Sequence, residues 1–126
     1  MIADTIDILD AEIVNFGIDY EILIEMNTNR YNIINVCNQK IMERFGSNLD
    51  IGEPIMLTDV FRALQSVPGV LDVTSVVVDL KAGGIYSEGN YDFQSALSSD
   101  GRRILAEPNI IFELKYPNVD IRGSIK

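Results

Sequence analysis

Several carboxylates in the sequence have a spacing that could support general acid–base chemistry. Asp19, Glu21 and Glu25 share one parity in a stretch of alternating residues, so a strand there would place them on one face. Paired carboxylates are the arrangement that glycoside hydrolysis uses. The same pattern is typical of an exposed sheet face or of a contact surface for a basic partner. We favour this second interpretation, with Asp19 and Glu21 as candidate interface residues.

A second acidic group lies at the start of the sequence and consists of Asp4, Asp7, Asp10 and Glu12. Carboxylates are good ligands for Ca²⁺, but the ligand spacing and the glycine of an EF-hand loop are absent. Residues 1–10 are therefore predicted to form an acidic, solvated leader. Residues 11–126 are predicted to form a single domain.

Two further motifs could bind an anion. Arg102 and Arg103 could hold a phosphate or a carboxylate, because guanidinium groups bind both in a bidentate way. A salt bridge between subunits explains the pair at least as well. The glycines Gly83 and Gly84 follow a predicted strand, but the spacing of a phosphate-binding loop is missing. We interpret that pair as a turn.

The absence of histidine limits the chemistry that the chain can perform. The sequence has no His and one cysteine, Cys37. A nucleophile–base pair of the Ser/His or Cys/His type is therefore excluded, as is a zinc site made of several thiolates. Cys37 falls on the apolar face of a predicted helix and is expected to be a small buried hydrophobe. We expect no catalytic residues, no cofactor and no metal.

The charge balance limits the partners. The 126 residues include 10 Lys and Arg against 19 Asp and Glu, which gives a net charge of −9. Binding to nucleic acid depends on cations at phosphates, and binding to anionic lipid depends on them too. We therefore expect neither nucleic acid nor a membrane surface as a partner.

The hydrophobic pattern predicts the elements that must position these residues. Alternation over residues 12–26 predicts a half-buried strand. Thr28 or Asn29 is a good helix N-cap, and the period of residues 31–45 is helical. Gly46 is well placed to end this helix.

A second helix and a second strand follow. Thr58 is predicted as the N-cap of the short helix, which Pro68 and Gly69 end. The valine-rich residues 70–81 predict a strand that is most deeply buried at residues 76–78.

The polar segment 82–103 is too long for an inert turn. We predict that it forms a protruding arm, and that its aromatic residues Tyr86, Tyr91 and Phe93 are anchors for a neighbouring protein. A last strand is predicted at residues 109–116.

This order predicts an α+β fold with two helices packed on one face of a three- to four-stranded, mainly antiparallel sheet, and a long arm before the last strand. The two strands that flank the helices could be parallel neighbours, or the last strand could separate them. The pattern leaves the strand order open.

Part of the sequence resembles a known family. Residues 50–54 (Asp-Ile-Gly-Glu-Pro), a short helix and residues 67–73 (Val-Pro-Gly-Val-Leu-Asp-Val) resemble the C-terminal domain of baseplate J-like proteins of contractile tails. In this motif Gly52 and Gly69 permit sharp turns and Pro68 stops the helix. The similarity to baseplate wedge subunits of T4-like phages extends over residues 13–18, 85–87, 112–118 and 120–123.

The resemblance implies a structural role. A wedge subunit of this family associates with other wedge proteins and with copies of itself, so we expect a homo-oligomer located in the tail baseplate of the virion and assembled in the host cytoplasm. It also implies that the chain corresponds to the C-terminal domain of a longer protein. The family offers no catalytic residues to transfer.

Two alternatives remain open. A small α+β domain can bind a small molecule in a regulatory role, which would give a ligand-dependent rise in melting temperature. A metal-dependent hydrolase built on Asp19 and Glu21 is the other alternative.

Overall fold

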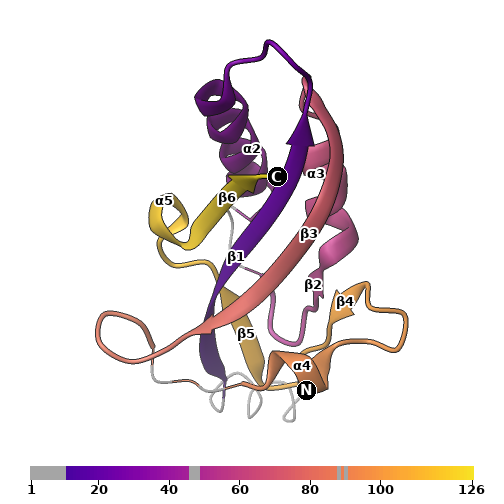
Figure 1. Cartoon of the computed structure of the whole chain (residues 1–126). Coiled ribbons are helices and arrows are strands. Elements are labelled where there is room, and N and C mark those ends of the chain that lie inside the picture. Colours follow the sequence, from indigo (N-terminus) through magenta and orange to yellow (C-terminus); the bar gives the residue numbers. More distant parts are fainter. Residues whose placement is uncertain (1–10, 46–48, 88, 90) are drawn as a thin grey trace.

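The computed structural model describes residues 11–45, 49–87, 89 and 91–126. It has an α+β fold with a mixed four-stranded sheet, a small two-stranded sheet and helices packed against the main sheet, which confirms the predicted fold class (Figure 1). The predicted leader and the predicted helix end at Gly46 lie outside the described residues.

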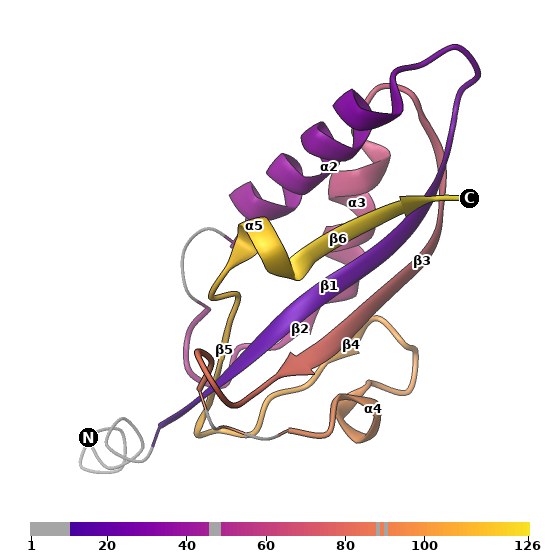
Figure 2. The ribbon, with the colours of Figure 1, turned by 60° about the vertical axis from the view of Figure 1, so that its left-hand side comes forward.

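Strand β1 (Glu12–Ile24) is the centre of the main sheet. Along one side it pairs antiparallel with β3 (Val70–Lys81). Along its other side it pairs in parallel first with β5 (Ile110–Glu113) and then with β6 (Ile121–Ile125). Figure 2 shows β6 beside the upper part of β1, joined to β5 through the short helix α5 (Pro117–Asp120).

Helices α2 (Arg30–Phe45) and α3 (Leu57–Gln65) cover one face of this sheet (Figure 2). The predicted cap of the first helix is confirmed at Asn29, whose Oδ1 accepts hydrogen bonds from the amides of Tyr31 (3.0 Å) and Asn32 (3.2 Å). The loss of one such cap typically costs about 1 kcal/mol.

The predicted cap of the second helix is wrong. Helix α3 begins at Leu57, and Met56 occupies the N-cap position without a side-chain hydrogen bond, so Thr58 lies inside the first turn. The amide of Leu57 donates instead to the carbonyl of Arg102 at 2.9 Å. The start of α3 is therefore fixed by a distant segment and not by its own sequence.

The two long strands are neighbours and run antiparallel, an arrangement that neither sequence alternative described. Helices α2 and α3 form a hairpin with an ion pair between Arg44 and Asp59 (Nε–Oδ2 3.0 Å). The hairpin returns the chain to the end of the sheet where β1 stops. The next strand must then run in the opposite direction, and the amide of Glu25 donates to the carbonyl of Gly69 (2.9 Å) where the two strands meet.

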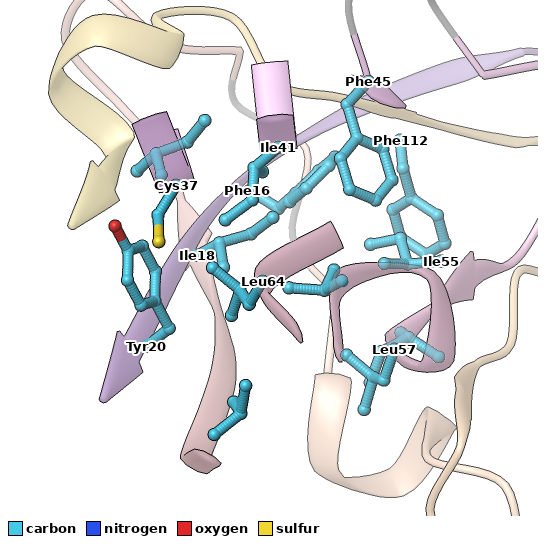
Figure 3. Close-up of a cluster of buried hydrophobic side chains, with 14 of the residues drawn as sticks. Phe16, Ile18, Tyr20, Cys37, Ile41, Phe45, Ile55, Leu57, Leu64 and Phe112 are labelled. Atoms are coloured by element: carbon cyan, nitrogen blue, oxygen red, sulfur yellow. The ribbon is translucent and has the colours of Figure 1, made fainter. Parts of the chain in front are cut away.

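The core lies between the main sheet and the helices. The even-numbered side chains of β1 from Val14 to Ile22 are buried, as predicted, but Asn15 and Gly17 on the opposite face are buried as well. Figure 3 shows Cys37 and Ile41 of α2, Leu64 of α3 and the aromatic rings of this cluster. Phe16 packs edge-to-face against Phe45 and Phe112, with ring centroids 5.8 and 6.4 Å apart.

The predicted burial of β3 is wrong. Val77 is 53% exposed, Val76 and Val78 are half-buried, and Val73 is the buried residue of the strand. The reason is topological, because β3 has a neighbouring strand on only one side and helices on only one face. A run of valines does not distinguish such an edge strand from a central one.

The segment predicted as a protruding arm folds back onto the domain. It contains helix α4 (Phe93–Ala96) and strand β4 (Arg103–Ile104), and β4 pairs antiparallel with β2 (Ile55–Met56). An isolated bridge joins Leu97 to Ile104. In Figure 1, α4 and β4 lie together beside the lower part of β3.

Candidate protein–protein interface

The aromatic residues predicted as anchors for a neighbour are used within the chain. The rings of Tyr91 and Phe93 lie 5.3 and 5.7 Å from the ring of Phe112. The hydroxyl of Tyr91 donates to the carbonyl of Leu105 at 2.8 Å. Phe93 is 8% exposed, so most of its ring packs within the chain, and what remains accessible lines a groove beside β3. The polar sequence around Phe93 gives no sign of this packing against the distant Phe112.

Tyr86 also faces its own chain. Its hydroxyl donates to Oδ1 of the buried Asp120 at 2.7 Å, and its ring lies edge-to-face with that of Tyr116 at 5.5 Å. The hydrogen bond to the Asp120 carboxylate raises the pKa of Tyr86, because the bond requires the phenol proton. Tyr86 therefore ties the segment after β3 to α5.

Asn15 is a buried structural residue that the sequence pattern did not reveal. It is fully buried on β1, where its Nδ2 donates to Oε1 of Glu113 and its Oδ1 accepts from the amide of Ser87, both at 2.7 Å. The residue ties β1 to β5 and to the loop after β3. Nothing in the alternating pattern distinguishes it from an exposed asparagine.

Cys37 is buried, as predicted. Its side chain is buried in the core, and this burial raises the pKa of its thiol to about 11. The neighbouring Tyr20 donates its hydroxyl proton to Oδ1 of Asn38 at 2.6 Å. A thiol that stays protonated at neutral pH is a poor nucleophile.

The predicted acidic pair lies on the open face of the sheet, opposite to the helices. Asp19 is exposed between Val77 of β3 and Arg122 of β6 in the strand register. Glu21 accepts a hydrogen bond from the hydroxyl of Thr74 at 2.8 Å. Each carboxylate thus has its own neighbours, an arrangement better suited to a contact surface than to a shared proton.

Arg102 lies directly before β4 and Arg103 is its first residue. Both side chains are exposed. Among the described residues, neither guanidinium has a carboxylate within salt-bridge distance. Arg102 lines a surface pocket of about 370 Å³ together with Leu57, Phe61 and Arg62. The pair therefore remains available for a partner.

The outer edge of β3 carries backbone groups without partners. The carbonyl of Ile22 accepts from Lys126 after β6, and the amide of Glu12 donates to Asn109 before β5. The even-numbered residues of β1 therefore direct their backbone groups toward β5 and β6, and the odd-numbered ones toward β3.

It follows from the register that Ser75, Val77 and Asp79 bond to β1, so the amides and carbonyls of Val76, Val78 and Leu80 point outward. Within the part of the chain that the structure describes, none of these outward groups has a hydrogen-bond partner.

An apolar groove of about 210 Å³ runs along this edge. Val77 and Leu97, on its two sides, are 53% and 42% exposed. The groove is lined by Leu57, Val76, Val77, Val78, Phe93, Gln94, Leu97 and Ile104. Sequence reasoning missed it, because β3 and α4 meet only in the folded chain.

Natural sheets usually protect such an edge. In β3 the protection lies at the two ends. Register shifts opposite Glu21–Ile22 and Leu23–Ile24 leave Thr74 and Leu71 unpaired as bulges, and Lys81 lies at the other end, where it pairs with Asp79 at 3.3 Å. The middle of the strand, residues 75–80, keeps a regular register and an apolar border.

The described residues offer no other obvious chemistry. Within residues 11–45, 49–87, 89 and 91–126, no three His, Cys, Asp or Glu side chains gather as metal ligands would. In the same residues no helix has the length and apolar character needed to span a membrane. Comparisons with protein-family models and with curated proteins find no match for this chain.

Proposed function

We propose that this chain is a structural assembly module of a contractile phage tail baseplate, which contacts other wedge proteins and copies of itself. The observation that carries the proposal is the unpaired middle of β3 beside an apolar groove. An open edge of this kind is a ready template for pairing with another chain.

The resemblance to baseplate J-like proteins adds support through the two glycines of its motif. Gly52 and Gly69 have φ angles of +75° and +96°, which side chains other than glycine adopt at a cost. The amide of Gly52 donates to the carbonyl of Ile110 at 2.7 Å, so this turn positions β5 beside the start of β1. The motif residues thus have a physical role in building the sheet whose edge is proposed to bind.

Three surfaces could share the assembly role. The β3 edge offers backbone hydrogen bonds and apolar area, the open face offers the carboxylates Asp19 and Glu21, and the β4 side offers Arg102 and Arg103. Surfaces of opposite charge on one molecule favour ordered association with neighbours in a ring, since like charges are kept apart.

The test is co-expression of this chain with the baseplate wedge proteins of the same phage, followed by size-exclusion chromatography with light scattering. We expect the chain to elute in a complex with at least one wedge protein. Replacing Val77, 53% exposed on β3, by Lys should weaken this complex. The matched control is Val119→Lys on α5, where the valine is 57% exposed, and it should have no effect.

The proposal would be overturned if the chain stayed monomeric in every mixture. The small-molecule alternative predicts a different result, namely a rise in melting temperature with a metabolite in a thermal screen. Such a rise without any assembly would replace the structural role by a regulatory one.

A further inference from the structure

We infer that the β3 edge receives an extended segment of another protein as an added strand, and that this segment alternates apolar residues with Lys or Arg. The inference rests on the proposed assembly function and names the partner segment that one of its surfaces would take. It concerns residues 75–80 of β3 and the groove between β3 and α4.

The backbone supplies the affinity. The outward amides and carbonyls of Val76, Val78 and Leu80 recur at every second residue, which is the spacing of one side of a strand ladder. A segment of about six residues would satisfy all of them. The bulges at Thr74 and Leu71 would end the pairing on one side.

The groove selects apolar side chains at alternate positions. Successive residues of a strand point to opposite faces, so every second residue of the added strand would enter the groove. There it would contact Phe93, Leu97 and Ile104, which have no charged neighbour among the lining residues. Burial of Leu97, 42% exposed in the free chain, would contribute to binding.

The remaining side chains of the segment would lie on the open face of the sheet, which is acidic. In the strand register this face presents Asp19, Glu21, Asp72, Asp79 and Glu113 against two cations, Lys81 and Arg122. A segment with Lys or Arg at these positions matches the excess of carboxylates. A second copy would bring another set of the same carboxylates and a net charge of −9, so it is the poorer occupant.

The experiment uses blocked synthetic peptides of about eight residues, long enough to span the edge. One alternates valine and lysine, the second replaces lysine by glutamate, and the third has the composition of the first with all valines before all lysines. Amide hydrogen exchange of the full chain is followed by NMR with and without each peptide. We expect the alternating valine–lysine peptide to slow exchange at Val76, Val78 and Leu80, and the other two peptides to bind at least about tenfold more weakly.

Two variants locate the site. Val78→Pro removes an outward amide that the ladder does not use, and Leu97→Lys places a charge in the groove without changing any residue of the main sheet. Each should weaken peptide binding by about tenfold or more. Val119→Lys, remote on α5, should bind as the unmodified chain does. If Val78→Pro fails to fold, the binding of the peptide to Leu97→Lys alone tests whether the groove is the site.

Unchanged exchange at the three amides with the alternating valine–lysine peptide would overturn the inference. Protection that appears in the chain alone as its concentration rises, with a doubling of mass, would overturn it in favour of a second copy. Failure of the assembly proposal alone would give a different result. The peptide would still slow exchange at the β3 edge, but no wedge protein would bind the chain.

Discussion

Gly69 joins α3 to β3 at a point where a side chain has no room. Its φ angle is +96°, and a Cβ atom placed there would lie 2.9 Å from Cδ1 of the buried Ile33. Gly101 has a similar φ angle of +72° but nothing within 4 Å of the same position. A side chain at Gly101 would therefore meet backbone strain alone, whereas one at Gly69 would meet both backbone strain and a steric clash.

We predict that Gly69→Ala lowers the free energy of unfolding more than Gly101→Ala does. The backbone strain common to both is roughly 1–2 kcal/mol. The contact with Ile33 adds roughly 1 kcal/mol or more, because a packed core gives way only partly. Urea denaturation of both variants checks this, and equal losses would show that Ile33 moves aside without cost.

At the residue scale, the local sequence predicted the turn glycines but not which aromatic side chains pack within the chain. Gly52 and Gly69 were predictable because a sharp turn requires a left-handed conformation that few other residues adopt. Phe93 was not, since its burial depends on Phe112, which belongs to another strand. Asn15 was missed for the same reason, because its partners Glu113 and Ser87 are distant in the sequence.

At the element scale, the two main helices are started by different means. Helix α2 uses the side chain of Asn29, whereas α3 uses the backbone carbonyl of Arg102. The first cap could be predicted from the sequence. The second could not, because the acceptor is the carbonyl of a residue far away in the sequence. The same limit explains the wrong burial at β3, where a valine run is compatible with the centre or the edge of a sheet.

We predict that Asn29→Ala lowers the free energy of unfolding by about 1 kcal/mol, since two amides of the first turn lose their acceptor. Asn35→Ala, at an exposed position within α2, should be neutral or slightly stabilising because alanine is the better helix former. Thermal or urea denaturation measures both. A loss at residue 35 equal to that at residue 29 would contradict the capping role.

At the scale of the whole molecule, β1 depends on the last elements of the chain. Strand β6 covers β1 from Ile18 to Ile22. A Cβ atom at Gly123 would overlap the ring of Tyr20, so the ring packs directly over this glycine of β6. The sequence predicted the α+β class, but not this parallel contact, because strand order follows from connections and packing and not from periodicity.

We predict that removing residues 117–126 destroys cooperative unfolding or causes self-association, because it exposes the side of β1 that β6 pairs with from Ile18 to Ile22. Circular dichroism and light scattering measure the two outcomes. Removal of Lys126 alone takes away one backbone hydrogen bond to Ile22 and should preserve a cooperative monomer. A monomeric truncated chain with an unchanged melting temperature would contradict the role of β6.

The pairing of β1 with β6 also has a consequence for synthesis in the cell. Tyr20 and Ser124, which lie in this pair of strands, are 104 residues apart. Translation at about 5–20 residues per second separates their appearance by on the order of ten seconds. Contacts between residues so far apart in the sequence also slow folding to the native state. The nascent chain thus carries β1 without its β6 neighbour until residues 121–125 have been made, and during that interval β1 exposes apolar side chains of the kind that chaperones bind.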